Sequence, residues 1–157
     1  STQLYDVLDV VGRRFQEVFS QLFGGGTAQI VLTDPDNILT GGIDFYIQPP
    51  GKKRQQLTLL SGGERALTVI ALLFSFLDYR PAPFCVLDEV DAALDEANVE
   101  RFSSYLNRVN KETQFIVVSH RKKTMEAAEV LQGVTMVERG VSRLLTVAFE
   151  DVKEDLA

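Results

Sequence analysis

The amino-acid sequence predicts an α/β fold, in which strands and helices alternate along the chain. Two continuous apolar runs, at 84–87 and 115–118, have the length and the residue types of buried strands. Helix-like segments at 62–77, 96–109 and 122–130 precede, separate and follow them. Polar residues come directly after both runs, and ligands in open α/β sheets bind beyond the carboxyl ends of the strands. The sequence therefore predicts a layered α/β fold and the edge of its sheet at which a site would lie.

Composition narrows the classes of function. The chain has 157 residues, enough for one domain with a sizeable core, and its 45% hydrophobic content argues against disorder. A net charge of -6 argues against nucleic-acid binding over the whole surface, although a local basic patch stays open. The longest apolar run, 66–77, is shorter than the about 20 residues that a membrane span needs. We therefore expect a cytoplasmic protein without a membrane partner.

Cysteine and histidine usage limits the metal chemistry. Cys85 is the single cysteine, so the chain has no internal disulfide, which fits a reducing compartment. One cysteine and one histidine do not make the ligand set of a zinc site. Any bound metal ion is therefore expected to be held by oxygen atoms.

The first part of the chain predicts a helix followed by a strand pair. Apolar residues recur in steps of three and four over 2–23, which is the spacing of a stripe on one helix face. They are Leu4, Val7, Leu8, Val11, Phe15, Val18, Phe19 and Leu22. A glycine run at 24–26 ends the helix. The segments 27–33 and 43–48 are predicted strands joined by an Asp-Pro-Asp-Asn turn. The basic loop 49–54 is either a solvated connection or a contact surface.

The remaining elements alternate between helix and strand. The helix 62–77 is apolar nearly all round, which predicts burial on every side. The strand 84–87 is typical of a central strand that is covered on both faces. The elements expected after it are a more polar helix at 96–109, a second buried strand at 115–118, a helix at 122–130 and strands at 134–138 and 142–149.

The start of the helix at residue 62 combines a good cap with two unfavourable glycines. Ser61 and Glu64 fit a capping box, in which the serine covers a free backbone N–H and the glutamate reaches back. Gly62 and Gly63 each cost up to about 1 kcal/mol relative to alanine in a helix. Bare backbone at a helix N-terminus lets an anion such as phosphate approach the unpaired N–H groups. We therefore interpret residues 61–64 as half of a phosphate-binding site.

Candidate catalytic residues follow the two apolar strands. Asp88 and Glu89 end the first, and His120 follows the second. Successive side chains of a strand point to different sides, so one carboxylate can hold Mg²⁺ through water while the other aligns an attacking water. Taken alone, the carboxylates favour a helix cap or a surface ion pair over a catalytic site, and His120 favours a core histidine.

The order of these motifs resembles that of the ABC-type ATPases. Residues 60–64 correspond to the signature motif, 84–89 to Walker B with its catalytic glutamate, 93–95 to the D-loop and 119–120 to the switch histidine. The chain is also similar to the C-terminal half of the ATPase head of a bacterial structural maintenance of chromosomes (SMC) protein. The segments that carry this similarity are "LLSGGERALTVIALLF", "PFCVLDEVDAALDEANVERF" and "FIVVSHRKKTMEAA". The resemblance covers nearly the whole chain and implies the C-terminal lobe of an ABC-type ATPase head.

The resemblance implies a role for each motif residue with ATP and Mg²⁺ as cofactors. Asp88 would support Mg²⁺ through water, and Glu89 would act as the hydrolytic base. His120 would sense the γ-phosphate, and Asp95 would communicate across a dimer of heads. Four residues would bind the γ-phosphate of an ATP molecule held by a second head, namely Ser61, Gly62, Gly63 and Glu64. The basic residues 121–123 are either a solvated turn or a contact to phosphate or DNA.

The same resemblance implies that this chain is one part of a head. No G-x-x-x-x-G-K-[ST] sequence occurs in it, and in the SMC family this Walker A loop belongs to the N-terminal half of the head. Residues 1–23 would be the root of a coiled-coil arm and residues 24–157 the C-terminal lobe. The implied partners are the N-terminal lobe, a second SMC head, a kleisin subunit and DNA, at the nucleoid. The isolated chain is expected to be inactive. Two alternatives stay open, the head lobe of another ABC-type DNA-repair ATPase and a module that mainly docks a kleisin.

Overall fold

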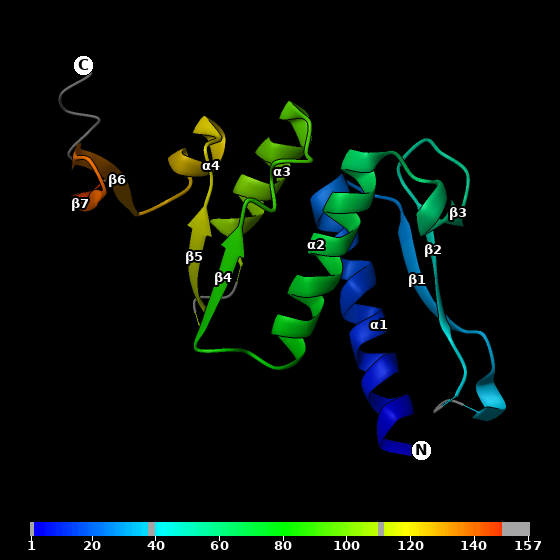
Figure 1. Cartoon of the computed structure of the whole chain (residues 1–157). Helices are drawn as coiled ribbons and strands as arrows, with labels where there is room; N and C mark the ends of the chain where they lie inside the picture. The colour runs from blue at the N-terminus through cyan, green and yellow to red at the C-terminus, as the bar shows by residue number, and fades with distance from the viewer. Residues whose placement is uncertain (1, 38–39, 110–111, 149–157) are drawn as a thin grey trace.

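The computed structural model describes residues 2–37, 40–109 and 112–148, and it confirms the α/β class (Figure 1). The helices are α1 (Thr2–Phe23), α2 (Gly62–Tyr79), α3 (Glu96–Leu106) and the short α4 (Lys122–Glu126). The strands are β1 (Thr27–Leu32), β2 (Ile43–Gln48), β3 (Gln55–Gln56), β4 (Phe84–Asp88), β5 (Gln114–Val118), β6 (Val130–Glu138) and β7 (Val141–Ala148). In the described part of the chain, no helix is long and apolar enough to cross a membrane.

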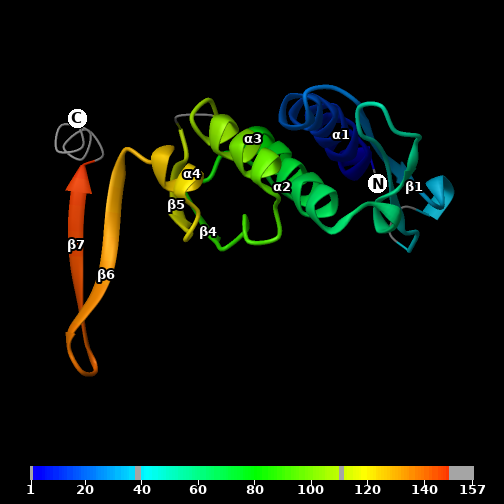
Figure 2. The same ribbon diagram turned by 90° about the horizontal axis from the view of Figure 1, so that it is seen from above.

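The strands form three separate small sheets. β1, β2 and β3 pair antiparallel, β6 and β7 form an antiparallel hairpin, and β4 and β5 pair in parallel. Figure 2 shows the β1 sheet near one end of the molecule, the β6–β7 hairpin at the other end, and the helices and the β4–β5 pair between them. Asp88 lies opposite Val118 in the parallel register, so both strands of this pair end at the same edge. That edge carries the candidate catalytic residues.

The hydrophobic core lies where α1, α2 and α3 pack together. Phe74 of α2 is fully buried and contacts three aromatic rings. Its ring centroid lies 6.4 Å from that of Phe102 and 4.9 Å from that of Tyr105, both on α3, and 5.7 Å from that of Phe115 on β5. Aromatic pairs of this kind add about 0.5–1.5 kcal/mol beyond their buried area. The core therefore fixes the β4–β5 pair against the helices.

A glycine turn joins α1 to β1 and requires its glycines. Gly26 has a φ of 84°, in the left-handed region that favours glycine. A Cβ on Gly26 would lie 2.3 Å from the backbone oxygen of Gln48, so a larger residue would displace β2. Gln16 of α1 holds the same turn, because its Nε2 donates to the Gly26 oxygen at 3.1 Å and its Oε1 accepts from the Ala28 nitrogen at 2.8 Å. The predicted helix 2–23 and its glycine stop are confirmed.

The prediction that 84–87 is covered on both faces is wrong for the described chain. Cys85 and Leu87 face the helices and belong to the core or pack against it. Four alternate side chains form the opposite face of the β4–β5 pair, which we call the open face. They are Phe84, Val86, Ile116 and Val118, with exposed fractions of 58%, 54%, 48% and 49%. The continuous apolar run reflects a sheet with two apolar faces, of which the described residues cover one.

The prediction that α2 is buried on every side is also wrong. Val69, Phe76 and Tyr79 are 52%, 47% and 44% exposed, because α1 and α3 cover only part of its circumference. Smaller differences concern the ends of elements. α3 ends at Leu106 rather than 109, and α4 ends at Glu126 rather than 130.

β6 begins at Val130, before the predicted 134, because 130–133 pair with the end of β7. Parts of three predictions lie outside the described residues. They are the strand end at 149, residue 1 of the expected arm root, and residues 149–157 of the expected lobe.

Candidate active site

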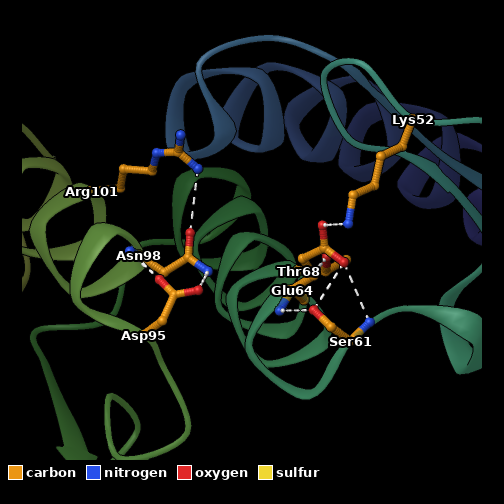
Figure 3. A network of polar contacts seen from close by, with 7 residues as sticks. All are labelled: Lys52, Ser61, Glu64, Thr68, Asp95, Asn98 and Arg101. Atoms are coloured by element: carbon orange, nitrogen blue, oxygen red, sulfur yellow. Dashed lines mark hydrogen bonds and ion pairs between the residues drawn. The ribbon is translucent and has the colours of Figure 1, made fainter.

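The start of α2 has the predicted capping box (Figure 3). The Ser61 side chain accepts a hydrogen bond from the Glu64 backbone nitrogen at 3.4 Å. Oε2 of Glu64 accepts from the Ser61 backbone nitrogen at 3.3 Å and from the Ser61 hydroxyl at 2.9 Å. The free N–H groups of the next residues keep the dipole of an 18-residue helix directed outward at this point. This end of α2 can therefore receive an anion.

The two glycines of this turn are not required by the packing of the described chain. A Cβ on Gly62 would meet no atom within 4 Å. A Cβ on Gly63 would lie 3.5 Å from the Ala93 oxygen and 3.8 Å from the Asp95 nitrogen, which are ordinary contacts. Neither glycine has a φ in the left-handed region. A requirement for glycine at these positions must therefore come from something that approaches from outside.

Lys52 connects the loop before β3 to this helix start. Its Nζ lies 2.7 Å from Oε1 of Glu64, whose side chain is only 16% exposed. Burial by itself would raise the pKa of Glu64, but hydrogen bonds from Lys52 and Ser61 and the Lys52 charge outweigh it, so the pKa of Glu64 is lowered. Lys52 thus neutralises a carboxylate that would otherwise repel an anion at the helix start. Lys52 of the basic loop is therefore a contact residue within the chain.

Glu89 stands in an unusual backbone conformation at the end of β4. It has a φ of 48°, and it is the one non-glycine residue with positive φ in the described ranges. Such a conformation costs of order 1–3 kcal/mol and is found preferentially at functional sites. The Glu89 backbone nitrogen donates to the Val118 oxygen at 2.9 Å, which ties the end of β4 to the end of β5. The backbone therefore leaves the extended conformation of β4 at Glu89.

The structure brings Glu89 and His120 together at this edge. Nδ1 of His120 lies 3.8 Å from Oε1 of Glu89, and both side chains are largely exposed, at 67% and 59%. His120 is therefore not a core histidine. Asp88, the last residue of β4, is also exposed. All three side chains are accessible from the surface, where they can contact a nucleotide.

Asp95 has a local structural role. It is the N-cap of α3, since its Oδ1 accepts from the Asn98 backbone nitrogen at 2.8 Å and its Oδ2 accepts from Asn98 Nδ2 at 3.3 Å (Figure 3). The Gly63 contacts to Ala93 and Asp95 also place the 93–95 loop beside the start of α2. Residues 61–64 and the loop at 93–95 are therefore neighbours in the chain.

The sequence did not identify Asp91 at this edge, and it did not indicate the partner of Arg121. Asp91 is fully buried and accepts hydrogen bonds from the hydroxyls of Ser119 and Thr124. Arg121 donates from a guanidinium nitrogen to the Leu94 oxygen at 3.0 Å, so it is not a plain solvated turn residue. The sequence does show Asp91 close to Asp88 and Glu89. Its hydrogen-bond partners, however, lie 28 and 33 residues away along the chain, so the sequence does not indicate them.

The residues present fit a hydrated magnesium ion but no metal site made by this chain alone. In the described residues, no group of three or more His, Cys, Asp or Glu side chains could hold a metal ion. Mg²⁺ keeps several waters and is commonly held by one or two carboxylates together with substrate phosphates. The exposed carboxylate of Asp88 matches that requirement. Asp88 would therefore hold the ion in combination with the phosphates of a bound nucleotide.

Comparison with known proteins identifies the family. The family model for the RecF/RecN/SMC N terminal domain matches residues 27–143. The chain belongs to this family. Among its relatives, the chromosome partition protein Smc of Bacillus subtilis is 60% identical over 149 residues, which is 95% of this chain and 13% of the relative. The Smc protein of Lactiplantibacillus plantarum is 54% identical over 155 residues, again 13% of its length. The chain thus spans about an eighth of these relatives.

Solved structures confirm that this member of the family has the α/β fold of an SMC ATPase head. A chain from work on ATP-driven dimerization and DNA stimulated activation of SMC ATPases matches with a TM-score of 0.88 and 35% identity, covering 99% of this chain and 94% of that chain. An SmcHead bound to the C-winged helix domain of ScpA matches with a TM-score of 0.85 and 36% identity, over 96% of this chain and 46% of that chain. The SMC head domain from Thermotoga maritima matches with a TM-score of 0.72 and 42% identity, covering 93% of this chain and 51% of that chain.

Proposed function

We propose that the chain is the C-terminal half of an SMC ATPase head. The observation that carries this proposal is the set of motifs at 60–64, 84–89, 93–95 and 119–120 without a Walker A sequence, in a chain that covers 46% and 51% of two solved heads. A family member that corresponds to half a head, and that has no Walker A sequence, must receive the β-phosphate-binding loop from the other half. On this proposal α1 is the root of the coiled-coil arm. Its later part is in the core from Val11 onward, while Leu4 and Tyr5 are 37% and 38% exposed.

The open face is the proposed docking surface for the N-terminal lobe of the same protein. Its four side chains alternate with core residues along two adjacent strands. A second layer on this face would bury them and complete the two-sided covering that is typical of parallel sheets. The site edge would then lie between the two lobes, because β4 and β5 end there.

We infer that the completed head hydrolyses ATP between two engaged heads. Asp88 supports Mg²⁺ through water, Glu89 accepts a proton from the attacking water, and His120 contacts the γ-phosphate. The exposed Glu89–His120 pair and the positive φ of Glu89 support these roles. Residues 61–64 bind the γ-phosphate held by the second head, which accounts for glycines that the packing of the chain does not need. Asp95 contributes to the interface from its position as cap of α3.

A role in chromosome partition and a kleisin partner are proposed from the relatives. The curated relatives are chromosome partition proteins, and two solved neighbours are heads bound to domains of ScpA. The β6–β7 hairpin favours a protein partner in addition to the nucleotide, since Val134, Val137 and Leu144 on it are 68–71% exposed. We therefore keep kleisin docking as a second function of this lobe. We also propose that the protein acts in the cytoplasm, at the nucleoid, where it contacts DNA. Another DNA-repair ATPase is the weaker alternative, given these relatives.

Co-expression of the two lobes tests the proposal. The purified 157-residue chain is expected to show no ATP turnover above a buffer blank, because it lacks the Walker A loop. The same chain co-purified with the N-terminal lobe should bind ATP and hydrolyse it with Mg²⁺. A lobe with its Walker A lysine replaced by alanine is the matched control and should co-purify without turnover. Steady hydrolysis by the isolated chain, or failure of the lobes to associate, would contradict the proposal.

A further inference from the structure

A buried polar cluster joins the loop after β4 to the segment after β5. Asp91 is fully buried, and Thr124 of α4 is 4% exposed. Oδ2 of Asp91 accepts a hydrogen bond from the Ser119 hydroxyl at 2.6 Å and another from the Thr124 hydroxyl. These three residues come from the β4–α3 loop, the end of β5 and α4, so one carboxylate oxygen connects three segments.

The cluster continues to the backbone on both sides of His120. The Ser119 hydroxyl also accepts a hydrogen bond from the Arg121 backbone nitrogen at 2.9 Å. The Arg121 guanidinium donates to the Leu94 oxygen at 3.0 Å and lies 3.6 Å from a carboxylate oxygen of Glu96. Both neighbours of His120 are therefore held, one by Asp91 and the other by the loop that leads to Asp95.

Burying the Asp91 carboxylate lowers the free energy of unfolding unless hydrogen bonds compensate. A buried carboxylate loses its hydration and needs hydrogen bonds to both oxygens to compensate. Oδ1 of Asp91 has no hydrogen-bond partner in the described part of the chain. Well-packed apolar residues often replace buried charges without loss of stability. Asp91 is two residues from Glu89 along the chain and accepts a hydrogen bond from Ser119, the neighbour of His120, which indicates a geometric role.

We propose that Asp91 is a positioning residue that holds the segments of Glu89, His120 and Asp95 as one unit. It touches none of the reacting atoms. By fixing Ser119, and through it the Arg121 backbone, it sets the position of His120 relative to Glu89 and couples the 119–121 segment to the 92–95 loop. A shift of His120 on nucleotide contact would then move the loop beside the start of α2. This inference rests on the proposed ATPase function.

The test is steady-state ATP hydrolysis by the head completed with its N-terminal lobe, with melting temperatures measured on the same samples. Thr124→Val removes one hydroxyl donor to Asp91 with little change of shape, and Thr124→Ser retains the hydroxyl. Ser103→Ala is the matched control, because Ser103 on α3 is also buried and its hydroxyl has no described partner. Asp91→Asn keeps the shape of the carboxylate and removes its charge.

We expect Thr124→Val and Asp91→Asn to lower kcat about tenfold while KM for ATP changes less than about twofold, since the lost contacts position the catalytic pair without touching substrate. Thr124→Ser should restore kcat, and Ser103→Ala should leave it unchanged. Parent-like kcat in Thr124→Val, with only a lower melting temperature, would reduce Asp91 to a structural residue and overturn the inference. A rise in KM at unchanged kcat would do the same. A parent protein without turnover would instead overturn the proposed function, and the inference with it.

Discussion

The helical core and the β4–β5 sheet are built from similar apolar residues but are covered very differently. Phe15, Phe19 and Phe74 in the core are fully buried, whereas Phe84 on the open face is 58% exposed. The core is completed by α1, α2 and α3 of this chain, while the sheet offers one face that no described element covers. The difference separates what the chain stabilises by itself from the face on which we propose that another lobe docks. Substitutions in the two regions should therefore act on different measurements.

The largest effect is expected at the edge of the incompletely covered sheet. Glu89→Gln in a head completed with its N-terminal lobe should lower ATP turnover about 10²–10⁴-fold, because the amide nearly keeps the shape but is a far poorer proton acceptor. The variant should retain ATP and Mg²⁺ and accumulate as an ATP-bound dimer. Size-exclusion chromatography with ATP and Mg²⁺, beside a turnover assay, measures both effects.

Asp88→Asn is the matched control for this variant. It changes the neighbouring carboxylate to its amide and should raise the Mg²⁺ concentration needed for turnover instead of trapping a dimer. If Glu89→Gln hydrolyses ATP at the parent rate, Glu89 is not the base and the edge of the sheet has been assigned the wrong chemistry.

The second effect concerns the core. Phe74→Ala should lower the free energy of unfolding by about 3–5 kcal/mol, since it leaves a cavity among Phe102, Tyr105 and Phe115. The loss should appear both in this chain and in the completed head, in urea titrations followed by circular dichroism. A loss confined to the completed head would show that the core also depends on the other lobe, which would break the comparison.

The third effect concerns the open face. Val86→Asp places a carboxylate where the N-terminal lobe is proposed to dock, so it should weaken the association of the lobes by at least about tenfold, because a charge would be buried without a partner. Stability of the chain alone should change little, since Val86 is 54% exposed. Val69→Asp on α2, at 52% exposure, is the control outside this face. Isothermal titration of the two lobes distinguishes them, and equal weakening by both would contradict docking at the open face.

Local signals in the sequence predicted more of this molecule than distant ones did. The capping box of Ser61 and Glu64 joins residues three apart, and the apolar stripe of α1 depends only on helical spacing, so both were predicted correctly. The meeting of Glu89 with His120 followed from the rule that parallel strands end at one edge. The hydrogen bonds of Asp91 and the contact of Arg121 with Leu94 join residues 27–33 apart, and no periodicity marks them.

The open face shows a second limit of the sequence. Continuous apolar runs indicate that both faces of a strand are covered in the complete protein, but they do not say which chain supplies the cover. The same limit applies to Gly62, where the sequence suggested a close approach and the described chain leaves open space. At both places the proposed partner lies outside the chain.

The smallest effect is expected at the start of α2, where Lys52 and Glu64 are paired within the chain. Lys52→Gln should lower the free energy of unfolding at pH 7 by about 0.2–1 kcal/mol, because the Lys52 side chain is 52% exposed and solvent weakens the pair. The pKa of Glu64 is lowered in the folded protein, so its stabilising contribution is fully present above its ordinary value of 4.5 and is lost as the pH falls through the lower folded value.

The difference between parent and Lys52→Gln should therefore be largest near neutral pH and vanish once Glu64 is protonated in both proteins. Urea titrations from pH 7 to pH 3 measure it. Arg13→Gln is the control, since the Arg13–Asp9 pair is 69% exposed on both sides and should contribute less at every pH. A difference that persists unchanged at pH 3 would show that Lys52 acts through packing of its stem. The pairing with Glu64 would then not be what prepares the helix start for an anion, and the glycines would have to receive phosphate beside an unneutralised carboxylate.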